Sequence, residues 1–339
     1  MTRYLQIAFK VFLIFLFPFV VLFLALFFDF FGKHQDLGKI ELIQAPYYNS
    51  VVESSSDKKI LFGDLHVHTT YSLDAFVGNL PILEGEGAHP VADACNFARF
   101  CANLDFFSVT DHAEFLTKRE WDETIESLRN CSLVSEEKDE EEIIPLAGWE
   151  WTQTSLNPEE HYGHKNVILK PLQGSLPARP IGAPDHKFFK SIVDAPIYAL
   201  YGALLYDYEN MSSYFNYRQR QLILRNLEYC DENKHVTELP LDCLERAEKP
   251  SDLYRKLDEW GMDSLVIPHG SAWGNTSPPM ASWRNQLNSS EHNEKYQNLV
   301  DLNVPLFILL KSINEFIIII PLLLQTSASI LILITYHMR

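Results

Sequence analysis

Cysteine is scarce in this sequence and is not arranged for metal binding. The five cysteines include no C-x-x-C pair, which excludes a zinc ribbon of the usual spacing. Cys95 and Cys101 lie six residues apart in a helical-looking segment and point to different faces, so a bridge between them is not expected. We expect buried free cysteines, although an outward-facing domain permits one or two disulfides. The full set is Cys95, Cys101, Cys131, Cys230 and Cys243.

Positive charge is also in short supply. The chain has 28 Lys and Arg against 45 Asp and Glu, a formal net charge of −17. A long polyanion would be repelled by this field, so we expect no nucleic-acid partner. A small anionic or phosphorylated substrate is still compatible, because bound divalent cations can dominate the local potential inside an acidic protein.

The amino-terminal region contains a long apolar run. Val11 to Phe28 has 18 residues without a charge, about the length of a membrane-spanning helix. We interpret residues 1–34 as a transmembrane anchor, with a cleaved secretory signal as the alternative. Arg3 and Lys10 precede the run and Asp29 follows it, so the positive-inside rule places the rest of the chain on the periplasmic or extracellular side of the membrane. Residues 35–58 are a polar linker from this anchor to the folded body.

The folded body shows short apolar runs that end abruptly in polar residues of the kind that bind metals. Such runs, rich in aromatic or β-branched residues, predict buried strands. Four stand out: Ile60 to Phe62 before Asp64, His66 and His68; Leu104 to Val109 before Asp111 and His112; Ile143 to Ala147 before Glu150; and Leu265 to Ile267 before His269.

Helical segments separate these runs. Pro90 to Ala102 is expected to bury a face made of Ala94, Phe97, Ala98 and Cys101, and Ser251 to Trp260 is expected to begin with a serine cap and to end at Gly261. Alternating helix and strand is typical of a parallel α/β fold, in which the active site gathers at the carboxyl ends of the strands. Residues 174–250 lack this rhythm and are rich in aromatics. We read them as an insertion, either a substrate-shaping lid or a helical subdomain that fills space.

The polar residues after the strands carry the chemistry. His66 and His68 are two apart, so on an extended strand they point to the same side. Imidazole and carboxylate donors without thiolate suit zinc, iron or manganese, and a metal-bound water of such a site is a hydroxide nucleophile near neutral pH. Glu150 is the natural bridging carboxylate, because each of its oxygens can face one ion. The donors that we expect to meet are His66, His68, His112, Glu150, His164 and His269.

Other polar residues near these motifs have two readings each. Asp111 is either part of the catalytic machinery or an acceptor that fixes the tautomer of a ligand histidine. His161 lies three residues before His164 and is either a proton donor to the leaving group or a loop histidine. Lys165, Arg99 and Arg119 are either contacts for an anionic substrate or ordinary surface residues.

These motifs resemble the polymerase and histidinol phosphatase (PHP) superfamily, and more closely an uncharacterised branch of it. The resemblance covers about Lys59 to Gln286 and rests on five ordered phrases: Gly63-Asp64-Leu65-His66, Thr110-Asp111-His112-Ala113-Glu114, Gly148-Trp149-Glu150-Trp151, Gly163-His164-Lys165-Asn166 and Pro268-His269-Gly270. It implies a distorted (β/α)7 TIM-like barrel over residues 59–290 and a phosphoesterase with two or three divalent ions, Zn, Mn or Fe. In that scheme His66 and His68 bind the first ion with Glu150, and the others are held by Asp74, His112, His164 and His269.

The superfamily's closing Asp-x-His motif does not follow His269. Residues 291–339 turn apolar instead, and Phe316 to Tyr336 is either a second membrane helix or the altered end of a truncated or frame-shifted chain. The barrel is therefore expected to be incomplete at its carboxyl end. The sequence predicts a metal-dependent hydrolase, with a catalytically impaired binding module or a membrane scaffold protein as the alternatives.

Overall fold

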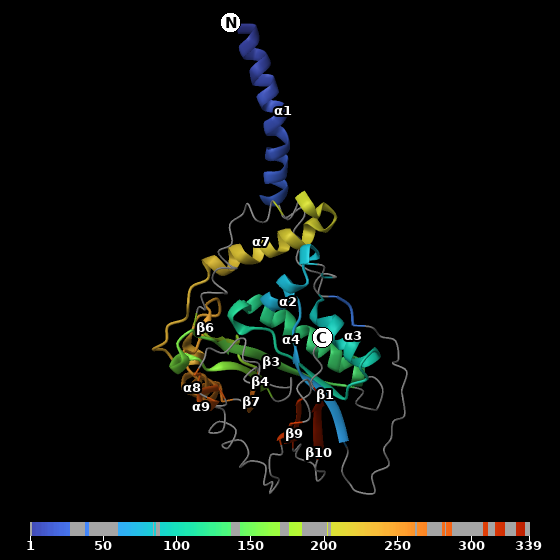
Figure 1. Cartoon of the computed structure of the whole chain (residues 1–339), viewed down its shortest axis with the longest axis vertical. Helices are drawn as coiled ribbons and strands as arrows, with labels where there is room; N and C mark the ends of the chain where they lie inside the picture. The colour runs from blue at the N-terminus through green and yellow to red at the C-terminus, as the bar shows by residue number, and fades with distance from the viewer. Residues whose placement is uncertain are drawn as a thin grey trace. The chain divides into compact units, whose positions relative to one another are not determined.

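The computed structural model divides the chain into two compact units. The first comprises Met1–Asp36, Gly78–Gly87 and Ser191–Asn226, and the second Leu37–Val77, Ala88–Lys190 and Leu227–Arg339. Figure 1 shows the chain with its helices and strands labelled. The structure describes residues 2–27, 38–40, 60–83, 85, 89–136, 143–169, 176–184, 202, 205–261, 263–269, 280–281, 283–286, 308–310, 316–322 and 330–335.

The first unit is helical where it is described. Its elements are α1 (Thr2–Phe27), η1 (Pro81–Leu83), η4 (Tyr208–Asn210) and α7 (Met211–Asn226). Within it, the buried Tyr214 hydroxyl donates to Asp207 and accepts from the backbone N–H of Ile82 at 3.0 Å. Among the residues that the structure describes, no helix combines the length and the apolar character needed to cross a membrane. The insertion expected at residues 174–250 is shared between the two units.

The second unit is organised around one eight-stranded sheet, in the order β7-β4-β3-β2-β1-β10-β9-β8. Strands β1, β2 and β3 run parallel to one another, and β10 runs parallel to β1 beside it. β4 is antiparallel to β3, and β7 is antiparallel to β4. On the other side of the sheet, β9 is antiparallel to β10, and β8 is antiparallel to β9. The strands are β1 (Ile60–Val67), β2 (Phe106–Val109), β3 (Ile144–Gln153), β4 (Gly163–Leu169), β7 (Ser264–His269), β8 (Ile308–Leu310), β9 (Phe316–Leu322) and β10 (Ile330–Thr335).

The five strands from β7 to β1 curl into a half-barrel. β7 and β1 are the outer members of this group, and in a flat sheet they would lie about 19 Å apart, four spacings of about 4.8 Å. Instead the ring centroids of His66 on β1 and His269 on β7 are 4.2 Å apart. The curl therefore brings side chains of the first and the last of these strands to the same place.

The expected (β/α)7 barrel is wrong for this chain. The sheet is open among the described strands, and β4 is antiparallel to β3. Only residues 154–162 connect these two strands, and a parallel connection needs a dozen residues or more. The apolar runs predicted the strands β1, β2, β3 and β7, but apolar runs carry no information on strand direction.

Where the structure describes it, the apolar tail of residues 291–339 forms strands and not the second membrane helix that was one of its two interpretations. Phe316 to Tyr336 was considered as a possible second membrane helix, and the structure instead forms β9 and β10 within it. β10 pairs in parallel with β1, from Ile60 opposite Leu331 to Gly63 opposite Ile334. The tail thus extends the sheet on the side of β1 away from β2.

The remaining elements of the second unit are helices, short turns and one small sheet. α4 (Lys118–Glu136) packs against β3 and α3 (Val91–Phe100), and Trp121 of α4 meets Trp149 of β3 edge to face with ring centroids 5.7 Å apart. The elements are α2 (Leu73–Gly78, which ends in the first unit), α3 (Val91–Phe100), η2 (Ala113–Phe115), α4 (Lys118–Glu136), η3 (Pro158–Glu160), β5 (Ile181–Gly182), η5 (Val236–Glu238), β6 (Glu245–Arg246), α8 (Pro250–Trp260) and α9 (Trp283–Gln286).

Two helix predictions need correction in detail. The buried face of α3 is formed by Val91, Ala92, Cys95 and Ala98, while Phe97 is 62% exposed. The bridge from Cys95 to Cys131 of α4 lies on that buried face and joins the two helices. α8 begins at Pro250 after Lys249 rather than with a serine cap, and it ends at Gly261 in the left-handed conformation, as predicted.

The expectation of free buried cysteines is wrong, and the structure shows the alternative of two disulfides. Cys95 is bonded to Cys131, and Cys230 to Cys243, so four of the five cysteines are in disulfides. Cys101 is free and exposed. The sequence excluded the Cys95–Cys101 pair correctly but contained no signal for the partners that the fold brings together.

Candidate metal centre

The end of β1 places two histidines on one side of the sheet. His66 and His68 are separated by Val67, so the alternation of an extended chain points both side chains the same way. Their Nε2 atoms lie 2.9 Å apart. Nitrogen atoms this close favour a shared proton or a shared cation, because two lone pairs would otherwise repel each other.

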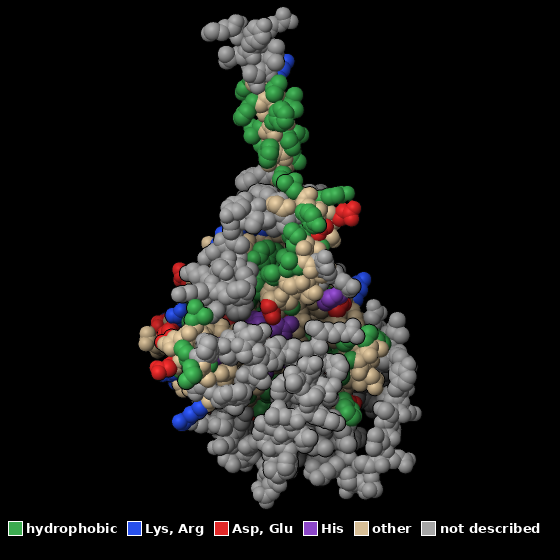
Figure 2. Space-filling model, in the orientation of Figure 1, with side chains coloured by type: hydrophobic (Ala, Val, Ile, Leu, Met, Phe, Trp, Pro, Cys, Tyr) green, Lys and Arg blue, Asp and Glu red, His purple; other side chains and the backbone are tan. Residues whose placement is uncertain are grey.

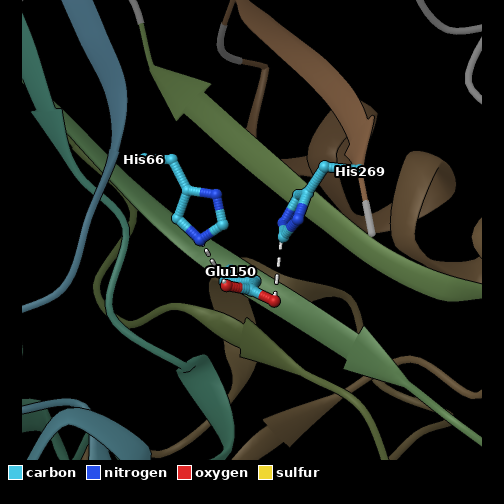
Figure 3. A group of neighbouring side chains, drawn as sticks. All are labelled: His66, Glu150 and His269. Carbon is cyan, nitrogen blue, oxygen red and sulfur yellow. Dashed lines mark ion pairs between the residues drawn. The ribbon is translucent and has the colours of Figure 1, made fainter. Parts of the chain in front are cut away.

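Glu150 of β3 lies at the centre of the site and is buried, with 1% of its side chain exposed. Its Oε2 is 2.8 Å from Nε2 of His68 and 3.2 Å from Nε2 of His66. Its Oε1 contacts Nδ1 of His164 and lies 3.5 Å from Nε2 of His269. Figure 3 shows the carboxylate between His66 and His269. Glu150 is therefore surrounded by histidine nitrogens on both sides, with His66 and His68 at Oε2 and His164 and His269 at Oε1.

Two groups of potential ligands overlap at Glu150. The first is His66, Glu150 and His269, and the second is His68, His112 and Glu150, with the ligand atoms of each group within 4.8 Å of one another. The donors are imidazole nitrogens and carboxylate oxygens, a set that suits a divalent zinc, iron or manganese ion. The residues present thus fit two divalent ions that would share the carboxylate of Glu150.

Asp74 lies at the second group. Its Oδ1 is 3.3 Å from Nδ1 of His68, and its Oδ2 is 3.4 Å from Nε2 of His112. The Ser72 hydroxyl donates to the same carboxylate at 2.5 Å and lies 2.9 Å from Nδ1 of His68. Nearly half of the Asp74 side chain is exposed, so this carboxylate forms the solvent-facing end of the cluster.

Thr152 joins the other side of the cluster, and the sequence reasoning missed it. Its hydroxyl lies 3.0 Å from Oε1 of Glu150, 2.9 Å from Nδ1 of His112 and 3.3 Å from Nδ1 of His164. A signal for it existed, because Thr152 is two residues after Glu150 on the same strand and therefore shares its face. By holding three site residues at once, the hydroxyl fixes their relative positions.

Glu114 is a second residue that the sequence reasoning assigned no role. Its Oε1 accepts from the backbone N–H groups of Thr152 at 3.0 Å and Ala183 at 2.7 Å, and its Oε2 lies 3.8 Å from Nδ1 of His112. Burial raises the pKa of this carboxyl against the lowering effect of His112 and the backbone donors. Glu114 thereby ties the strand that carries Glu150 to β5.

Asp111 supports the turn that follows β1. It is buried, and its carboxylate accepts from the backbone N–H of Thr69 at 2.5 Å and from the Thr69 hydroxyl at 2.7 Å. Thr69 directly follows His68. Through these contacts Asp111 holds the backbone next to His68 in place.

His161 and Lys165 each contact backbone atoms of the chain. His161 is buried, with Nδ1 at 3.2 Å from both the backbone nitrogen and the carbonyl oxygen of Ser155. Lys165 is on the face of β4 opposite His164, where its amine donates to the carbonyl oxygens of Tyr162 and Gln286. Burial lowers the pKa of this lysine to about 7. Neither of the two readings given to Lys165, substrate contact or surface residue, describes it.

The two arginines considered with Lys165 also differ from each other. Arg99 is buried in α3 with its guanidinium over the ring of Phe100, whereas the Arg119 side chain is 45% exposed and pairs with Glu120 at 2.7 Å. Arg119 is thus a surface residue, one of its two expected readings, and Arg99 is not.

The charges of the cluster depend on one another. Burial alone would raise the pKa of Glu150, but His112, His269 and His164 lower it well below its usual range. Burial would lower the pKa of His112, and the nearby Glu150 and Asp74 carboxylates instead raise it to about 9. Burial, with the neighbouring histidines, lowers the pKa of His269 well below its usual value. A neutral His269 keeps a lone pair for a cation.

The histidines are more accessible than the carboxylate they surround. His66 and His68 have 15% and 14% of their side chains exposed, and His164 and His269 have 20% each. Histidine side chains are visible at the surface in Figure 2. Solvent therefore reaches the cluster at the edges of these histidines and at the Asp74 carboxylate, while Glu150 lies beneath them.

Comparison with known proteins gives one partial match. A family described as "Protein of unknown function (DUF3604)" matches residues 55–136, the segment that contains His66, His68, Asp74 and His112. No curated protein and no solved structure matches the chain.

Proposed function

We propose that this chain is a metal-dependent hydrolase, and in the first instance a phosphoesterase, with two divalent ions that share Glu150. The observation that carries the proposal is the overlap of two ligand groups at one buried carboxylate. A protein folds a buried carboxylate among five histidines at a large desolvation penalty unless cations or protons compensate it. Two ions would compensate both oxygens and the surrounding lone pairs together.

Divalent ions bound in this way acidify a water molecule and stabilise the charge on a phosphoryl oxygen. The chain's own residues hold the histidine rings in position. Thr152 and Ser72 fix the ring orientations of His112 and His68 through their hydroxyls, and Asp111 holds the backbone beside His68. Ligands held by such outer contacts keep their geometry when substrate enters.

The substrate class follows from the accessible side of the cluster. A molecule that approaches there meets the partly exposed histidines and the Asp74 carboxylate. Two bound divalent cations would outweigh the negative charges of Asp74 and Glu150, while the rest of this acidic chain repels anions. A small anionic or phosphorylated substrate is therefore guided to the site by local charge alone. Zn, Mn and Fe are all compatible with this donor set.

The two disulfides bear on where this chemistry takes place. Disulfides persist in oxidising compartments and are rare in the cytosol. The bonds of Cys95 with Cys131 and of Cys230 with Cys243 therefore support a periplasmic or extracellular location for the second unit.

Metal analysis of the full chain tests the proposal. Chelator-treated protein is reloaded with Zn²⁺, Mn²⁺ or Fe²⁺ and assayed for bound metal and for cleavage of nitrophenyl phosphate mono- and diesters. We expect about two ions per chain and hydrolysis that requires them. His66→Ala should abolish hydrolysis, whereas His89→Ala is the matched control, since His89 is exposed and pairs with Asp93 on the surface.

Two results would count against the proposal in different ways. Less than one bound ion per chain at saturating metal would refute the metal centre. Two ions without cleavage of any ester would favour the alternative of a catalytically impaired binding module.

A further inference from the structure

Asn166 is a buried amide that joins three strands at the metal centre. It lies on β4 directly opposite Glu150 of β3, so both side chains share the face of the sheet that carries the site. Its Nδ2 donates to the carbonyl oxygen of Leu65 on β1 at 2.9 Å. Its Oδ1 lies 3.0 Å from Nε2 of His269 on β7.

The contact with Leu65 fixes which end of the amide faces the site. Reversing the amide would set Oδ1 against the carbonyl oxygen of Leu65, and two acceptors at 2.9 Å repel each other. The amide nitrogen is therefore held at β1. The amide oxygen is turned toward His269 and the ligand group to which that residue belongs.

Oδ1 of Asn166 lies as close to His269 as a neighbouring ligand of one ion would. It is 3.0 Å from Nε2 of His269, and the ligand atoms of His66, Glu150 and His269 lie within 4.8 Å of one another. Adjacent ligands at bond lengths of about 2.1 Å lie about 3.0 Å apart in an octahedron and about 3.4 Å apart in a tetrahedron.

We propose that the amide oxygen of Asn166 is a further ligand of the ion held by His66, Glu150 and His269. This inference rests on the metal centre proposed above and makes its chemistry more specific. A carbonyl oxygen is a hard, neutral donor that suits Mn²⁺ better than Zn²⁺. The amide oxygen is therefore expected to raise the affinity of this position for Mn²⁺ more than its affinity for Zn²⁺.

Two substitutions separate ligation from a purely structural role. Asn166→Leu removes both the oxygen and the donor to Leu65. Asn166→Asp keeps an oxygen for the ion and loses the donor. Gln153→Leu is the control, because Gln153 of β3 also donates an amide N–H to a backbone carbonyl, that of Glu248 at 3.0 Å, and belongs to neither ligand group.

Mn²⁺ and Zn²⁺ affinities of the full chain are measured by competition with a chelating indicator at one pH. We expect Asn166→Leu to weaken one of two Mn²⁺ sites by about 10-fold or more and to weaken Zn²⁺ binding less. Asn166→Asp and Gln153→Leu should bind Mn²⁺ at least as tightly as the unchanged chain. Asn166→Ala carries the same expectation as Asn166→Leu and serves if the leucine variant does not fold.

Two outcomes would overturn the inference while the metal centre stands. One is an unchanged Mn²⁺ affinity in both Asn166→Leu and Asn166→Ala. The other is an equal loss in Asn166→Asp, which would mean that Asn166 acts by tying β4 to Leu65. If the unchanged chain itself binds no ion, the proposed function fails, and this inference fails with it.

Discussion

Gly63 of β1 and Phe106 of β2 are direct partners in the parallel pair, and the ring of Phe106 occupies the position that a Cβ atom on residue 63 would take. The ring is buried with 4% exposure, so it has little room to move. This close approach sets the distance between the strand that carries His66 and its neighbour. Gly63 is thus required for its lack of a side chain.

Gly63→Ala should therefore destabilise the protein. Forcing a methyl group into a packed core costs about 1–3 kcal/mol. Urea denaturation measures the effect, and Gly78→Ala is the control, since a Cβ at Gly78 meets nothing within 4 Å. Adding Phe106→Leu should recover part of the loss. A Gly63→Ala variant as stable as the Gly78→Ala variant would contradict the packing described here.

Replacing Glu150 should remove both ions at once. Glu150 belongs to both ligand groups, whereas His66 belongs to one. We expect Glu150→Gln to bind no ion tightly and His66→Ala to keep one, as measured by metal content after gel filtration. Glu160→Gln, an exposed carboxylate outside both groups, should bind metal normally. Retention of one ion in Glu150→Gln would show that Glu150 is not shared.

The two disulfides should contribute differently to stability. The Cys95–Cys131 bond spans 36 residues and the Cys230–Cys243 bond 13. From loop entropy alone the losses on removal are about 4 and about 3 kcal/mol. Denaturation of Cys95→Ala/Cys131→Ala and Cys230→Ala/Cys243→Ala variants measures them. Alkylation of the unreduced, denatured chain should label Cys101 only, and labelling of five cysteines would contradict both bonds.

Lys165 gives a pH dependence with a definite sign. Its pKa is about 7 in the folded chain against 10.5 for the free side chain, so between these values the unfolded state binds more protons. Stability from this group therefore rises with pH between about 7 and about 10.5 and is lowest below pH 7. Lys165→Met should remove this rise and should stabilise the protein most at low pH. If the unchanged chain and the Lys165→Met variant had the same pH profile of stability, the lowered pKa of a buried Lys165 amine would be refuted.

Much of the candidate site was predictable from the sequence, because the placement of its donor side chains follows local rules. His66 and His68 share a face through the two-residue period of a strand, and apolar runs marked the strands that end near His112, Glu150 and His269. The same rule applied to β4 would have found Asn166 beside His164, and applied to β3 it would have found Thr152 beside Glu150. Asn166 and Thr152 were missed because asparagine and threonine are not residue types that by themselves indicate a metal site.

Other features had no local signal. The reversal of β4 against β3, the bonding of Cys95 with Cys131, and the burial of Lys165 all depend on which segments meet across the fold. Phe97 was placed on the wrong face of α3 because hydrophobicity alone predicts burial, whereas the contact with α4 decides which side of the helix faces inward.

The sequence by itself determined the candidate donor residues, four of the eight strands of the main sheet and the acidic net charge, because these follow from residue type and short-range periodicity. Only the tertiary structure decided the open, curled sheet. That curl sets His66 and His269, on strands that are not neighbours, on either side of Glu150. The physical reason is that curvature and strand direction arise from packing and connection length summed over the whole sheet.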